Sequence, residues 1–91
     1  MNTLRLTIAA LFLAPVLAHA GADCVAHPKD SWMKKADLRA KLETAGYKVK
    51  KLKVDGNCYE MYGTHNDGRR FEIYMDTVSG KPVKTVTRPS K

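Results

Sequence analysis

The sequence has few residues of the kinds that build catalytic and metal sites. Its 91 residues include two cysteines, three histidines and one tryptophan. The two cysteines are far apart, which excludes a Cys-x-x-Cys redox motif. A zinc site needs about four ligands, and the nearest further candidates, His27 and His65, have no ligand spacing. No nucleophile stands beside a base, so we expect neither an enzyme, a metal site nor a bound cofactor.

Long apolar runs are lacking except at the start of the chain. Residues 6–17 form an apolar run interrupted only by Thr7 and Pro15, after a short start that carries Arg5. Small residues at Ala18 and Ala20 follow, as in a secretory signal peptide. The alternative, an uncleaved membrane anchor, would need roughly 20 apolar residues. We therefore expect cleavage after Ala20 and a periplasmic or secreted protein.

Acidic residues are also scarce, with 9 against 16 basic ones and a net charge of +7. Removing residues 1–20 takes away only Arg5 and leaves a domain too small for a large core. The two cysteines, Cys24 and Cys58, both remain, and an even pair in an exported protein predicts a disulfide. Closing a loop of this length stabilises the chain by about 3.5–4 kcal/mol.

Hydrophobic periodicity predicts one helix and three or four strands after a polar leading segment at residues 21–30. Leu38, Leu42 and Ala45 recur at helical spacing over residues 34–45, and Gly46 marks the helix end. Strands are predicted over residues 47–54, 57–64, 69–76 and 81–86, with a bulge near Lys50. Residues 87–91 read as a flexible tail. The turn-forming residues are Asp55, Gly56, Asp67, Gly68, Asp76 and Gly80.

The sequence predicts which face is buried for the third strand, but not for the second. In the third strand, Phe71, Ile73 and Met75 share the packed face, and Arg70, Glu72 and Tyr74 share the other. In strand 57–64 the alternation leaves two choices, because Cys58 and Tyr62 favour one buried face whereas Tyr59 and Met61 favour the other. Glu60 and Glu72 read as a surface ion-pair cluster with Arg69 and Arg70.

The order of these elements resembles the PepSY domain family, in particular its small secreted single-domain members. The likeness covers roughly residues 30–86 and is carried by Trp32, Leu38, Leu42, Gly46, Tyr47, Cys58, Tyr59, Glu60, Asp67, Gly68, Arg69, Tyr74, Asp76 and Gly80. Val78 and Ser79 depart from the proline and threonine common in the last turn. The resemblance implies an α+β fold, one α-helix on an antiparallel sheet in α-β-β-β order. It also implies a module that binds and restrains peptidases or other envelope proteins, with no catalytic residues.

The candidate partner-binding residues are four lysines and two tyrosines, Lys48, Lys50, Lys51, Lys53, Tyr62 and Tyr74. A solvated edge strand, on which lysines discourage strand-to-strand aggregation, is the simpler explanation of the four lysines. They also suit an acidic partner or weak contact with an anionic membrane surface. Tyrosines 59, 62 and 74 with Trp32 fit cross-strand pairing better than one aromatic binding surface. Export and the absence of a recognition motif exclude nucleic acid.

Two functions follow from these observations. The first is a non-catalytic envelope binding module whose partner is an envelope protein, in particular a peptidase that it modulates or inhibits. The alternative is a binder of a small ligand such as haem, a metal or an anionic lipid headgroup.

Overall fold

A computed structural model of the chain describes residues 21–89. The predicted signal peptide at residues 1–20 therefore lies outside the described residues, as do residues 90 and 91. Within the described part, no helix has both the length and the apolar character needed to cross a bilayer.

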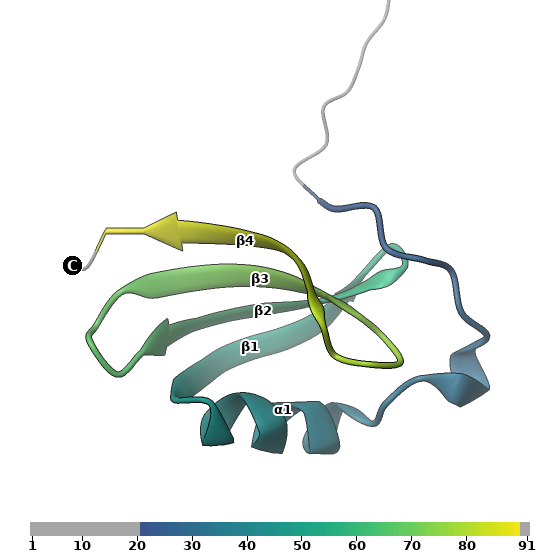
Figure 1. Cartoon of the computed structure of the whole chain (residues 1–91), viewed down its shortest axis with the longest axis horizontal. Coiled ribbons are helices and arrows are strands. Elements are labelled where there is room, and N and C mark those ends of the chain that lie inside the picture. The colour runs from purple at the N-terminus through teal and green to yellow at the C-terminus, as the bar shows by residue number, and fades with distance from the viewer. Residues whose placement is uncertain (1–20, 90–91) are drawn as a thin grey trace, which may run out of the picture.

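One helix and four strands follow the leading segment in a simple order. The elements are a short 3₁₀-helix η1 (Lys29–Ser31), α1 (Lys35–Thr44), β1 (Tyr47–Asp55), β2 (Cys58–His65), β3 (Arg70–Asp76) and β4 (Pro82–Arg88). The strands form one antiparallel sheet in the order β1-β2-β3-β4, and α1 runs alongside β1 (Figure 1). This arrangement confirms the predicted α+β class, with four strands.

The helix is held by two leucines rather than by its caps. Leu38 and Leu42 are buried against the sheet, where the core also contains Tyr59, Met61 and Ile73. The residue before the helix is Lys34, which makes no side-chain capping bond. A helix of ten residues is marginal alone, and packing must supply its stability.

A bulge in β1 allows both halves of that strand to contribute to the core. The register of β1 with β2 shifts between Val49 and Lys51, which leaves Lys50 as the extra residue. Leu52 then lies opposite Met61, and both Val49 and Leu52 pack against the core cluster. The bulge predicted at this place is therefore present, and it returns the strand to the same inward face.

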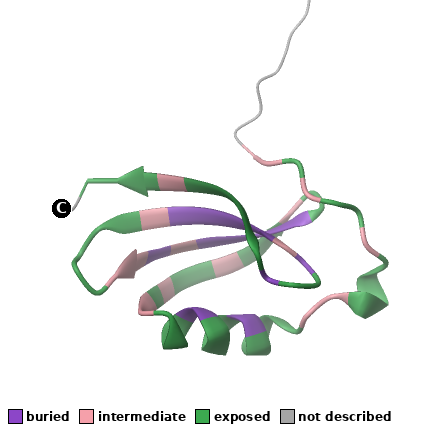
Figure 2. Ribbon diagram, viewed as in Figure 1, coloured by how far each residue is buried: buried purple, intermediate pink, exposed green. Residues whose placement is uncertain are grey.

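Both faces of β2 are buried, which answers the choice that its alternation left open. Tyr59 and Met61 face the helix, whereas Cys58 and Glu60 are buried on the opposite side. Figure 2 shows buried residues concentrated in the two central strands, β2 and β3. A central strand of a small sheet can be enclosed by its long-chain neighbours even where no second layer covers it.

The disulfide predicted from the sequence is present and ties the leading segment to β2. Cys24 and Cys58 are joined with their Cα atoms 5.4 Å apart. Nearby, the His27 Nε2 and Asp76 Oδ1 atoms are 2.8 Å apart. The leading segment is thereby fixed to the ends of both β2 and β3.

Trp32 and Met33 complete this attachment on the helix side of the sheet. The Met33 N–H donates to the Thr77 carbonyl at 2.8 Å, and the Tyr59 hydroxyl donates to the Met33 carbonyl at 2.7 Å. The Trp32 ring lies edge-on to Tyr59, with centroids 5.4 Å apart. Trp32 thus packs at the rim of the core.

Most element boundaries differ by one residue from those expected, and the end of the last strand differs by two. The last strand continues through Arg88, so Thr87 and Arg88 belong to β4 and not to a tail. β3 begins at Arg70, one residue later than expected. β2 continues through His65, one residue beyond its predicted end. In each case pairing with the neighbouring strand sets the end.

Replacing both cysteines with alanine tests the contribution of the disulfide. The bond closes a separation of 34 residues, and its loss should lower the free energy of unfolding by about 3.5–4 kcal/mol. For a domain whose total stability is about 5 kcal/mol, the variant should be close to unfolding in urea titrations at room temperature. An unfolding midpoint within error of the native protein would contradict this expectation.

Gly63→Ala tests the bulge. A Cβ atom at Gly63 would lie 2.3 Å from the backbone carbonyl oxygen of Lys48, which cannot move without disturbing the β1–β2 ladder. We expect a loss of about 3 kcal/mol, at the upper end for an overpacked site. Gly56→Ala is the control, because its Cβ would meet no atom and only its positive φ of 60° would cost about 1 kcal/mol. Equal losses in the two variants would count against a close approach at Gly63.

Candidate functional site

The sheet face opposite α1, called the open face below, carries two buried glutamates together with basic and tyrosine side chains. Strand register places its residues in three rows across the sheet. The rows are Lys53, Glu60, Tyr74 and Lys84; Lys51, Tyr62, Glu72 and Val86; and Lys48, Thr64, Arg70 and Arg88. The first row is near the disulfide and the third is near the β2–β3 turn.

Two glutamates lie buried at the centre of the open face. Glu60 is 3% exposed and Glu72 is 7% exposed. The Tyr74 hydroxyl donates to Glu72 Oε2 at 2.8 Å, and Arg88 Nη2 donates to Glu72 Oε1 at 3.2 Å. Lys53 Nζ is 3.8 Å from Glu60 Oε1. The interpretation as a surface cluster with Arg69 and Arg70 was therefore wrong in both burial and partners.

Burial and mutual contact shift the pKa values of Glu60 and Glu72 in opposite directions. Burial, followed by the hydrogen bond with Glu72, raises the pKa of Glu60. The hydrogen bond from Glu60, aided by those from Tyr74, Tyr62 and Arg88, lowers the pKa of Glu72 to about 2 despite burial. Glu60 is thus the member of the pair that takes up a proton first, and Glu72 holds the negative charge.

The two glutamates also shift the pKa values of the neighbouring tyrosines, Tyr62 and Tyr74. Hydrogen bonding to Glu60 and Glu72 raises the pKa of Tyr62, and burial together with the Glu72 bond raises that of Tyr74. Both hydroxyls therefore remain protonated donors. Tyr74 is only 2% exposed, so its side chain lies inside the network, and its role in partner binding stays a prediction. Its ring and hydroxyl serve the interior of the open face.

The lysines of β1 are exposed, and two of them lie over the remaining tyrosine. Lys51 Nζ and Lys53 Nζ are 5.5 and 5.6 Å from the centroid of the half-buried Tyr62 ring. Cation–π contacts at this distance orient the ammonium groups. Lys48, which precedes the bulge, and Lys50, which is its extra residue, are exposed as well. All four lysines and Tyr62 are accessible to a partner.

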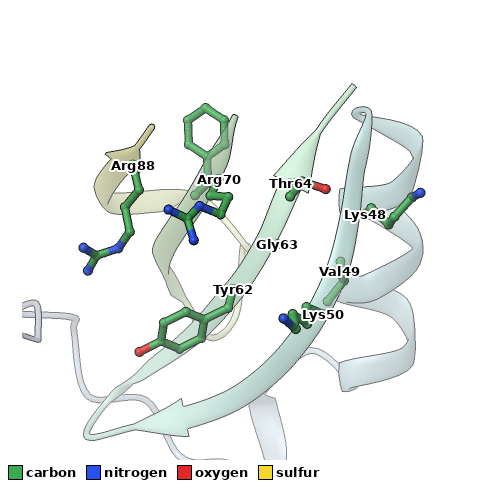
Figure 3. Close-up of a pocket in the computed structure, with 9 residues that line it drawn as sticks. Lys48, Val49, Lys50, Tyr62, Gly63, Thr64, Arg70 and Arg88 are labelled. Atoms are coloured by element: carbon green, nitrogen blue, oxygen red, sulfur yellow. The ribbon is translucent and has the colours of Figure 1, made fainter. Parts of the chain in front are cut away.

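Two hollows open on this face and meet at Tyr62. One, of about 590 Å³, is lined by Lys48, Lys50, Thr64, Arg70 and Arg88 among others. Figure 3 shows Arg70 and Arg88 extending from neighbouring strands near Tyr62, while the ammonium of Lys48 points outward. The other hollow, of about 430 Å³, lies toward the disulfide and is lined by both glutamates, Tyr74 and Gly21.

The turn residues have mainly local roles. Gly56, Gly68 and Gly80 have φ values of 60°, 88° and 75°. Asp67 Oδ1 accepts the Arg69 N–H at 3.0 Å, and Asp55 ends β1 opposite Cys58. Asp76 Oδ2 accepts the backbone N–H groups of Val78 and Ser79 at 3.0 and 2.8 Å. The Ser79 N–H, followed by the contact with His27, lowers the pKa of Asp76.

The aromatic residues do not form one surface. Trp32 and Tyr59 pack on the helix side, whereas Tyr62 and Tyr74 lie on the open face. His65 packs edge-on against Tyr47, with ring centroids 4.8 Å apart. Residues 21–89 contain no group of three or more His, Cys, Asp or Glu side chains arranged to hold a metal ion.

Sequence reasoning missed the basic residues of β3 and β4. Arg70 and Arg88 lie directly opposite each other, and Thr64 lies opposite Arg70. The alternation in β3 placed Arg70 on the correct face. No local signal linked Arg70 to Arg88, because Arg88 was predicted to lie in the tail. Only the pairing of β4 brings Arg88 to this site.

Comparison with known families gives one match over most of the chain. Residues 3–86 match the family described as peptidase propeptide and YPEB domain, which is the PepSY family. The chain belongs to this family. The match begins within the predicted signal peptide and ends within β4. Searches of curated proteins and of solved structures found no significant match to this PepSY protein.

Isosteric substitutions of the two glutamates should have opposite effects at pH 7. Glu72→Gln removes a charge that accepts bonds from Tyr74 and Arg88, and should cost about 1.5–3 kcal/mol. Glu60→Gln imitates the protonated form that burial favours, and should leave stability unchanged or higher. Urea unfolding of both variants provides the measurement. A larger loss for Glu60→Gln than for Glu72→Gln would show that the charge resides on the other carboxyl.

The effect of Glu72 should also depend on pH with a defined sign. Its pKa falls from 4.5 to about 2 on folding, so its stabilisation is present above pH 4.5 and is lost as the pH falls toward 2. The difference in stability between native protein and Glu72→Gln should therefore shrink over this range. A difference that grows on acidification would contradict the assigned direction.

Proposed function

We propose that this PepSY protein is a non-catalytic binding module of the cell envelope that restrains a peptidase through its open face. The observation that carries the proposal is the contrast between the two faces of the sheet. One face is covered by α1, whereas the other presents exposed lysines around a half-buried tyrosine. An exposed, chemically distinct face on a rigid sheet is suited to receive a partner.

The family supports a peptidase as that partner. Its description names peptidase propeptides, which are segments joined to the enzymes whose activity they restrain. The family model covers residues 3–86, and so nearly the whole described domain. We infer that its partner is a peptidase.

Export is supported by the sequence of residues 1–20 and by the disulfide. A bond between Cys24 and Cys58 persists in oxidising compartments such as the periplasm and is rare in the cytosol. We infer that the protein functions in the periplasm or outside the cell, after cleavage following Ala20. Weak attraction of its basic surface to anionic lipid would keep it near the envelope.

A binding role rather than catalysis is supported by the state of the reactive groups. Both cysteines are joined in the disulfide. The buried carboxyls of Glu60 and Glu72 are occupied by Lys53, Tyr74 and Arg88. These contacts fit a structural network that fixes the open face, because no nucleophile lies within it.

Affinity capture from a periplasmic extract of the native host tests this function. The bait should retain a peptidase, and captured peptidase should be less active on a protein substrate than enzyme released from the bait. Lys51→Gln/Lys53→Gln should reduce capture, because both lysines are exposed on the open face. Lys34→Gln/Lys35→Gln is the control, since it removes the same charge beside α1. Equal capture by both variants, or no peptidase retained, would contradict the proposal.

A further inference from the structure

The end of the open face near the β2–β3 turn carries an excess of positive charge. Four basic residues line the 590 Å³ hollow there, and they are called the cationic end: Lys48, Lys50, Arg70 and Arg88. Among residues 21–89, only Arg88 of these four forms an ion pair with a carboxylate, that of Glu72. The neighbouring glutamates therefore leave most of this charge uncompensated.

Two arginines face each other at the centre of the cationic end. Arg70 and Arg88 are direct cross-strand partners, a placement in which like charges destabilise a sheet. Arg70 Nε donates to the Pro89 carbonyl at 3.0 Å, and Arg88 Nη2 is directed at Glu72. A guanidinium has five N–H donors, so each arginine retains several for a ligand. An anion between them would relieve their repulsion.

The rest of the hollow suits a carboxylate carried on a peptide. Thr64 supplies a hydroxyl and Tyr62 supplies ring surface. Figure 3 shows Tyr62 and Thr64 on β2, between β1 and the two arginines. The guanidinium fork matches a carboxylate in a bidentate manner. Such a surface offers both charge and van der Waals contact to an extended chain.

A lipid surface fits these residues less well. Among residues 21–89 the large exposed hydrophobic residues are Val25, Val54, Val78 and Val83, and none of them lines the hollow. The cationic end consequently has no apolar anchor for insertion into a bilayer. Its charge and its partly aromatic lining both favour a polypeptide.

We propose that the cationic end binds an acidic segment of a partner polypeptide, with one carboxylate held by Arg70 and Arg88 and another by Lys50. This inference rests on the proposed function, in which the open face receives a protein. It specifies that the bound segment is rich in Asp or Glu and that it crosses the strands toward the bulge. The lysines over Tyr62 then extend the same positive surface.

An NMR titration of the full exported protein with a capped hexaglutamate peptide tests the proposal. The peptide should shift the backbone amides of Thr64, Arg70 and Phe71 in a saturable manner, and a capped hexaglutamine peptide should not. Arg70→Gln/Lys50→Gln should weaken binding about fivefold or more, because two exposed charges are lost. Lys34→Gln/Lys35→Gln removes equal charge outside the hollow and should change binding less than twofold. Inorganic phosphate and phosphatidylglycerol vesicles serve as parallel probes.

Each outcome bears on one claim. Equal weakening in the two double variants, or shifts outside the hollow, would overturn the cationic end as a site. Phosphate or vesicles that shift these amides while hexaglutamate does not would assign the site to a phosphate group instead. If hexaglutamate fails but peptidase capture is unchanged by Arg70→Gln/Lys50→Gln, the proposed function stands and this inference fails. If hexaglutamate binds but no peptidase is captured, the peptide site stands without that function.

Discussion

The covalent tie between Cys24 and Cys58 is the constraint on which the rest of this small domain depends. It fixes the leading segment to the first residue of β2, and a contact between His27 and Asp76 fixes the same segment to the end of β3. The segment then passes to the helix side, where the Met33 backbone bonds to Thr77. Because α1 is short and contributes only two buried leucines, its position is set largely by this attached segment.

This arrangement leaves the sheet with one covered face and one exposed face. The open face is not simply solvated, because Glu60, Glu72 and Tyr74 form a buried polar network at its centre. Such a network stabilises one arrangement of its members when every polar group has a partner. Glu72 binds Arg88 and Tyr74, and Glu60 lies near Lys53. The network thereby fixes the tyrosines and one arginine, while the surrounding lysines remain exposed for a partner.

Local sequence signals predicted the architecture well because they act over a few residues. Alternation of Phe71, Ile73 and Met75 identified the inward face of β3, and the placement of Val49 and Leu52 favoured a bulge between them. The even cysteine count predicted the disulfide without any geometric information. Each of these features follows from the periodicity of a single segment or from chemistry that is independent of the fold.

The chemistry of the open face could not be predicted in the same way, because it depends on neighbours distant in sequence. Alternation placed Glu72 and Tyr74 on the outer face, but their burial results from long side chains on adjoining strands. The sequence placed Arg88 in a tail, because no local signal indicated a strand there. Its pairing with Arg70 shows that β4 extends through Arg88. The helix begins within one residue of its predicted start, although the residue before it, Lys34, makes no side-chain capping bond.

The central claim is that attachment of the leading segment stabilises the whole sheet and not only that segment. Residue-resolved hydrogen exchange of the oxidised and reduced forms tests it most directly. The account predicts that reduction lowers protection by the same factor throughout β2 and β3, because the sheet opens as one cooperative unit. Loss of protection confined to residues 21–33, with β2 and β3 amides unchanged, would contradict it.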